Sequence, residues 1–164
     1  MSTVLVAEEI AAAVAGCRAA GAGLVLALVA PGDDDAFSAL AAALGLPYVN
    51  ASLELARRLL DVPVGRRAWR AGEALPTLVD AALPAVALGR LGLLHLPELQ
   101  IDPLRALQQL ARTRVVLAEW QGTLEDGRLT YARPGHAEYR SWPLPAAAVI
   151  PLTPAPGGLP RALP

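Results

Sequence analysis

Three consecutive aspartates follow a proline and a glycine directly after an apolar run, residues 24–30. A carboxylate just before a helix can cap its first turn, and hard oxygen ligands can also bridge a divalent cation to a phosphate. A cap with solvated charges is the ordinary interpretation, so we expect no metal site and keep a metal bridge as the alternative. The candidate ligand-binding turn consists of Gly32, Asp33, Asp34 and Asp35.

This turn stands where a nucleotide-binding phosphate loop, or P-loop, would stand, because it joins a buried strand to a helix. A P-loop needs glycines whose backbone N–H groups surround phosphates, a lysine, and a Ser or Thr hydroxyl for magnesium. Here one glycine is followed by three carboxylates, and all 14 basic residues of the chain are arginines. Each carboxylate would repel a polyphosphate by roughly 1 kcal/mol in high dielectric. The sequence predicts a degenerate Walker A loop, with Arg90 as the candidate that replaces its lysine.

A second element of nucleotide hydrolysis, the acidic Walker B residue at the end of a buried strand, is also missing. The expected strand 85–88 is followed by Gly89 and Arg90, whereas Asp80 lies before this strand and Glu98 well after it. Because two independent elements are absent, we expect no catalytic residue and no bound cofactor. Weak binding of ATP with magnesium at Arg90 and the aspartate turn is the alternative.

Arginine and aromatic side chains gather in two further segments. Together these residue types are typical of the energetically dominant residues in protein interfaces. They also occur in ordinary solvated surfaces and on stacking platforms for single-stranded nucleic acid. The candidate interface residues are Arg66, Arg67, Trp69, Arg70, Arg133, His136, Tyr139 and Arg140.

The two histidines and the lone Cys17 are too scattered to indicate a zinc site. His95 stands in an apolar stretch, which favours a packed or rim histidine. His136 lies near Glu138, a pairing that could do acid–base chemistry near neutral pH. No nucleophile accompanies this pair, so we interpret its loop as structural or as part of an interface.

The elements that must position these residues alternate between helix and strand. Helical spacing predicts helices over 3–20, 36–44, about 51–61, a stretch ending near 83, and 103–112. Apolar runs predict strands over 24–30, 48–50, 85–88, 115–120 and 146–150, with an arginine-rich turn at 64–70 and a hairpin within 121–142. Such alternation implies an α/β three-layer sandwich like that of P-loop NTPases, a mostly parallel sheet of about five strands with helices on both faces. Ligands of such sheets bind beyond the carboxyl ends of the strands.

The bulk composition indicates a single soluble domain. Hydrophobic residues make up 54% of the 164 residues, and the net charge of −1 gives no general attraction to DNA or to an anionic membrane. The apolar runs are shorter than the about 20 residues of a membrane span, and the start lacks signal-peptide features. We expect a cytoplasmic protein with one domain over 1–150 and a flexible tail over 151–164, which holds five prolines and two glycines.

A more specific pattern lies in the C-terminal half. The segments that carry it are Asp102–Arg112, Trp120–Thr123 and Gly127–Arg140, with Tyr48–Asn50, Leu53 and Leu55–Leu60 upstream. Over roughly residues 24–142 the chain resembles the BrxF family, the small P-loop-annotated component of type 3 BREX bacteriophage-exclusion systems. The resemblance implies a defence assembly that also holds a large ATPase, a DNA methyltransferase and a phosphatase-like protein. Since the chain departs from the family in the phosphate loop, the resemblance supports the fold and the pathway but not ATP binding.

Taken together, these patterns predict a non-catalytic, P-loop-like adaptor of an anti-phage complex, which contacts its partners through the arginine and aromatic segments. The first alternative is a nucleotide-binding subunit that uses Arg90 in place of lysine, since arginine binds phosphate well and stays charged. The second is a DNA-contacting subunit, although the net charge does not indicate one. A homo-oligomer is compatible with each of the three.

Overall fold

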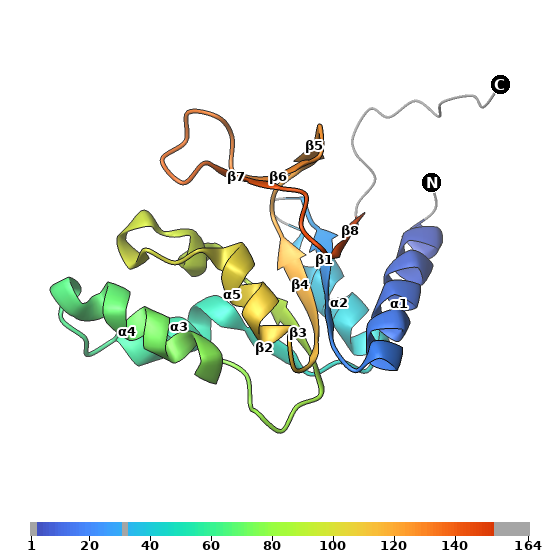
Figure 1. Cartoon of the computed structure of the whole chain (residues 1–164), viewed down its shortest axis with the longest axis horizontal. Helices are drawn as coiled ribbons and strands as arrows, with labels where there is room; N and C mark the ends of the chain where they lie inside the picture. The colour runs from blue at the N-terminus through green and yellow to red at the C-terminus, as the bar shows by residue number, and fades with distance from the viewer. Residues whose placement is uncertain (1–2, 31–32, 153–164) are drawn as a thin grey trace.

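Five parallel strands form the centre of the computed structural model, which describes residues 3–30 and 33–152 (Figure 1). The strands are β1 (Gly23–Leu28), β2 (Tyr48–Asn50), β3 (Ala85–Gly89), β4 (Val115–Trp120) and β8 (Ala148–Pro151). Their order across the sheet is β2-β3-β4-β1-β8, and every neighbouring pair is parallel. The expected α/β class and five-stranded parallel sheet are confirmed.

Helices cover both faces of this sheet and make a three-layer sandwich (Figure 1). One face carries α1 (Thr3–Ala20) and α2 (Asp34–Ala43), and the other carries α3 (Ala51–Leu59), α4 (Arg67–Ala74) and α5 (Pro103–Leu110). The chain runs from β1 to the far edge strand β2 through α2, and then returns through β3 to β4 with α3, α4 and α5 on the opposite face. Right-handed crossovers require this change of face when the direction of travel reverses.

A small antiparallel sheet follows β4 and lies above the carboxyl ends of the central strands (Figure 1). Its strands are β5 (Leu124–Glu125), β6 (Arg128–Tyr131) and β7 (Arg140–Pro143). Leu129 and Trp142 belong to the main core, and the indole of Trp120 donates to the carbonyl of Thr130 at 2.9 Å. The predicted hairpin is therefore present, gains a third strand, and is packed onto the domain.

The arginine-rich segment expected as a turn is helical, and that prediction was wrong. The 3₁₀ helix η1 (Val64–Arg66) leads directly into α4, which buries Ala71 and Ala74. Arginine and alanine are good helix formers, so the polar character of this segment did not indicate a turn. The 3₁₀ helix η2 (Leu75–Thr77), which contains Pro76, directly follows α4, and the helical stretch therefore ends at Thr77, before the expected residue 83.

The described chain continues past the expected boundary at 150. Leu152 is buried, and its N–H donates to the carbonyl of Leu28 at 2.8 Å. The rest of the predicted tail, residues 153–164, is outside the described residues. Within residues 3–30 and 33–152, no helix is both long enough and apolar enough to cross a membrane.

Candidate functional site

A cleft of about 750 Å³ opens at the carboxyl ends of β2, β3 and β4. Register brings these ends together, since Asn50 pairs with Gly89 and Leu88 pairs with Ala118. The 3₁₀ helix η3 (Gly92–His95) and strand β6 close its sides. The residues that line it are Asn50, Ser52, Leu53, Ala56, Arg90, Leu91, Gly92, Leu93, His95, Glu119, Gln121 and Tyr131.

Arg90 lines this cleft and has a left-handed backbone conformation, with φ of 55°. Its carbonyl accepts from the Ser52 N–H at 2.9 Å and from the Ser52 hydroxyl. Its own N–H donates to Oε2 of Glu119 at 3.3 Å. A non-glycine residue held in this region by bonds from two other elements is typical of functional sites. The backbone of the candidate residue Arg90 is thus held by Ser52 and by Glu119.

Glu119 is a functional candidate that we did not single out from the sequence. Its side chain is 2% exposed near the carboxyl end of β4, and Oε1 accepts from Nε2 of Gln121 at 3.4 Å. The carboxylate therefore positions the backbone of Arg90 and the amide of Gln121. The signal that could have revealed it is an acidic residue inside the otherwise apolar strand 115–120, because a buried carboxylate needs a partner.

Gly89 occupies the position where the Walker B acid was expected. A Cβ atom there would lie 2.6 Å from Cε2 of Tyr48 and still closer to its hydroxyl. The Tyr48 ring also packs against Phe37 of α2, with ring centroids 6.3 Å apart. The space of a side chain at this position is thus filled by a ring from the neighbouring strand.

The aspartate turn is described only in part. Gly32 lies outside the described residues, and Asp35 is exposed. Asp33 is the residue immediately before α2. The predicted cap is wrong for Asp33, whose side chain makes no cap hydrogen bond. Capping side chains start from extended backbone, whereas Asp33 has φ −102° and ψ 36°. In the described part of the chain, no three His, Cys, Asp or Glu side chains come close enough to share a metal ion.

An aromatic cluster joins the cleft to the small sheet. His95 is 3% exposed and stacks on Tyr131 with ring centroids 3.4 Å apart and planes at 7°. Trp120 meets His95 edge-on at 5.1 Å. Burial, and then the Arg140 charge, lower the pKa of His95 to about 3, and Asp102 opposes this shift. Burial, helped by Glu138, raises the pKa of Tyr131. The expected packed histidine is confirmed.

Arg140, predicted as an interface residue, makes contacts inside the chain. It donates to the carbonyl of Ile101 at 2.7 Å, lies over the ring of Trp142 at 5.2 Å, and comes within 4.0 Å of Asp102. Asp102 also caps α5 through Arg105, as the sequence predicts, and accepts from the indole of Trp142 at 3.2 Å. These bonds fasten β7 to the start of α5.

The other predicted interface residues lie in two separate places. Arg66, Arg67, Trp69 and Arg70 belong to η1 and α4, whereas Arg133, His136 and Tyr139 lie in the β6–β7 connection. In Figure 1 this connection lies at the top of the view, whereas α4 lies at the lower left. The His136 ring accepts from the N–H of Glu138 at 3.1 Å, so this pair makes a local turn.

Arg66, Arg67, Trp69 and Arg70 belong to the surface formed by residues 54–74, which we call the α3–α4 face. This surface also carries exposed apolar side chains. Leu60 is 77% exposed, Val64 78% and Trp69 67%. Leu60 and Val64 also line a mostly apolar groove of about 490 Å³, whose other wall includes Leu96. Because Leu60 and Val64 line the same groove, they form a joined apolar surface of the kind that marks interaction sites, whereas scattered single residues do not.

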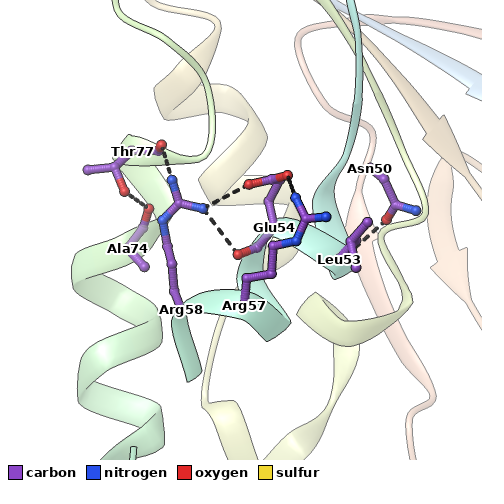
Figure 2. Close-up of polar contacts among 7 residues, drawn as sticks. All are labelled: Asn50, Leu53, Glu54, Arg57, Arg58, Ala74 and Thr77. Carbon is purple, nitrogen blue, oxygen red and sulfur yellow. Dashed lines mark hydrogen bonds and ion pairs between the residues drawn. The ribbon is translucent and has the colours of Figure 1, made fainter. Parts of the chain in front are cut away.

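Polar contacts hold α3 against the end of α4 beneath this face (Figure 2). Arg58 donates to the carbonyl of Thr77 at 2.8 Å and to the carbonyl of Glu54 at 3.1 Å. Glu54 also pairs with Arg57 at 2.9 Å. At the start of α3, Oδ1 of Asn50 accepts from the N–H of Leu53 at 2.9 Å. Arg58 therefore ties α3 to the segment that follows α4.

Comparisons of the chain with protein-family models, with curated proteins and with solved structures find no match. The resemblance to the BrxF family therefore stands on the sequence motifs alone.

Proposed function

We propose that the chain is a non-catalytic, P-loop-like adaptor subunit of a bacterial anti-phage (BREX) complex, and that it binds a protein partner through the α3–α4 face. The observation that carries this proposal is the exposure of Leu60, Val64 and Trp69 within ten residues of chain. Tryptophan and arginine are the residue types most enriched among interface residues that dominate binding energy. Membership of a BREX assembly is supported by the sequence resemblance.

The charge of the α3–α4 face favours a partner that carries carboxylates around an apolar centre. Residues 54–74 hold five arginines and three acidic residues. Two of these acids, Glu54 and Glu73, already pair with arginines of the same helices. The remaining positive charge would attract an acidic rim, while the groove beside Leu60 and Val64 would accept apolar side chains, as in helix-in-groove recognition.

The Arg58 bonds support the same role, because a surface that is already ordered loses less conformational entropy on binding. Non-catalytic character is supported by the chain's lack of lysine and by the Tyr48 ring at the Walker B position. The P-loop-like fold is supported by the placement of β1 in the sheet interior, with its turn leading into α2.

Pairwise co-expression tests the proposal. The chain is co-purified separately with the large ATPase, the methyltransferase and the phosphatase-like protein of a BREX system. We expect one of them to form a stable complex that Leu60→Ser and Trp69→Ala disrupt. Leu5→Ser is the matched control, because Leu5 is also exposed (55%) but lies on α1 in the opposite layer. Absence of any complex, or equal loss with the control, would refute the adaptor role.

A further inference from the structure

We propose that the cleft at the ends of β2, β3 and β4 binds a nucleoside monophosphate, with the phosphate at Arg90 and the base between the apolar and aromatic walls. This cleft adjoins the groove of the α3–α4 face, since Ala56 and Leu93 line both, but neither proposal depends on the other. The proposal stands on the fixed backbone of Arg90, on the shape of the cleft, and on its single guanidinium group.

The first step concerns how Arg90 is held. Ser52 of α3 binds its carbonyl, and Glu119 of β4 binds its N–H, so bonds from two elements impose the left-handed backbone at φ of 55°. The Ser52 hydroxyl also accepts from the N–H of Leu93 at 3.0 Å, which ties the following 3₁₀ helix to the same point. A guanidinium is the side chain best suited to bind phosphate, and pre-organisation of its backbone lowers the entropy lost on binding.

The second step concerns the walls. Tyr131 gives the cleft an aromatic wall, with the buried His95 stacked on one face of its ring, and Leu53, Leu91 and Leu93 give it an apolar side. Aromatic rings stack on any nucleobase, since every base has a π face. Asn50 and Gln121 add amides, the groups that form paired hydrogen bonds with base edges. The volume of about 750 Å³ lies within the range of small-molecule sites.

The third step concerns charge. Among the described residues that line the cleft, Arg90 is the one arginine, and the Glu119 carboxylate accepts from its backbone N–H. His95 is buried and neutral, and therefore adds no positive charge. One guanidinium compensates the charge of a single phosphate group better than that of a triphosphate, which would meet uncompensated repulsion.

The test is calorimetric titration of the whole chain with AMP, GMP, CMP and UMP, and in parallel with adenosine, guanosine and inorganic phosphate. We expect at least one monophosphate to bind with a Kd below about 100 μM. The nucleosides and inorganic phosphate should each bind at least about tenfold more weakly, because each has only part of the recognised chemistry. No heat with any of the four monophosphates, or equal affinity for inorganic phosphate, would overturn the proposal.

Two variants locate the ligand. Arg90→Gly removes the guanidinium and suits the left-handed backbone, so binding should fall more than about tenfold without a lower melting temperature. Gly92→Phe places a ring where a Cβ has no atom within 4 Å, and it should block the cleft without disturbing the core. Arg18→Ala, an exposed arginine on α1, is the control and should leave affinity unchanged. Unaltered binding in both Arg90→Gly and Gly92→Phe would refute a site in this cleft.

Discussion

The ring of Tyr48 lies against the backbone of Gly89, in the space that a side chain on β3 would occupy. Gly89 at the end of β3 therefore has a structural role in addition to the absence of an acidic side chain. It makes room for a ring that links β2 to Phe37 of α2. Restoration of an acid at this position would require the ring to move.

The contact between Tyr48 and Gly89 predicts a coupled pair. Gly89→Ala should destabilise the fold by roughly 1–3 kcal/mol, because the added methyl displaces the ring. In the Tyr48→Ala background the same change should have a much smaller effect, and urea unfolding of the double-mutant cycle measures the difference. Additive effects of the two substitutions would show that the ring and the glycine do not interact.

Arg58 and Arg57 offer a matched comparison on one helix. Arg58→Ala should lower the free energy of unfolding by about 1.5–3 kcal/mol, since its guanidinium bonds join α3 to the carbonyl of Thr77. Arg57→Ala removes only an exposed pair with Glu54 and should change stability by less than about 1 kcal/mol. Chemical denaturation measures both. Similar values for the two variants would contradict the role given to Arg58.

Asp102 should combine two stabilising roles. Asp102→Ala removes the cap of α5 and the acceptor for the Trp142 indole, so a loss of more than about 1 kcal/mol is expected. Asp102→Asn keeps a good cap and an acceptor oxygen, and its loss should be clearly smaller. Thermal unfolding at neutral pH measures the two. An equal loss would mean that the carboxylate charge matters more than the hydrogen bonds.

The buried His95 should make stability fall in acid. Its pKa is about 3 in the folded chain and about 6.5 when unfolded, so between these pH values only the unfolded chain takes up the proton. Stability should therefore decrease as the pH falls below about 6.5, by at most about 1.4 kcal/mol per pH unit, and level off near pH 3. Unfolding free energies of the wild type and of His95→Phe, measured from pH 7.5 to pH 5, isolate this contribution.

His136→Ala is the control for that pH series, because His136 is exposed in the β6–β7 connection. This variant should keep the slope of the wild type, whereas His95→Phe should lose most of it. The opposite pattern would place the titrating histidine in the exposed loop.

Sequence patterns were sufficient for elements whose signals are local. The apolar run at Val115–Trp120, interrupted only by Glu119, predicted β4 with its observed bounds, and helical spacing predicted the start of α5 at Pro103. Alternation of helix and strand then led to a parallel sheet, because the crossover rules leave few other arrangements. The prediction of a turn for the arginine-rich segment was wrong, because its polarity was interpreted as a turn signal although arginine and alanine favour helix.

The candidate site was predicted only in part, since its geometry depends on contacts between distant residues. Arg90 was identified from its place after a strand, but its left-handed backbone depends on Ser52 and Glu119, 38 and 29 residues away. Likewise, the ring of Tyr48 above Gly89 follows from the pairing of β2 with β3, which no local pattern specifies.

The measurement that tests the central claim most directly is the affinity of the purified chain for the BREX component with which it co-purifies, determined by calorimetry. Trp69→Ala should weaken this affinity by at least about tenfold, as expected for a dominant interface residue. Tyr139→Ala, which changes an exposed aromatic residue of the β6–β7 connection, should leave it within about twofold. An unchanged affinity in Trp69→Ala, or a larger loss in Tyr139→Ala, would contradict an adaptor that binds through the α3–α4 face.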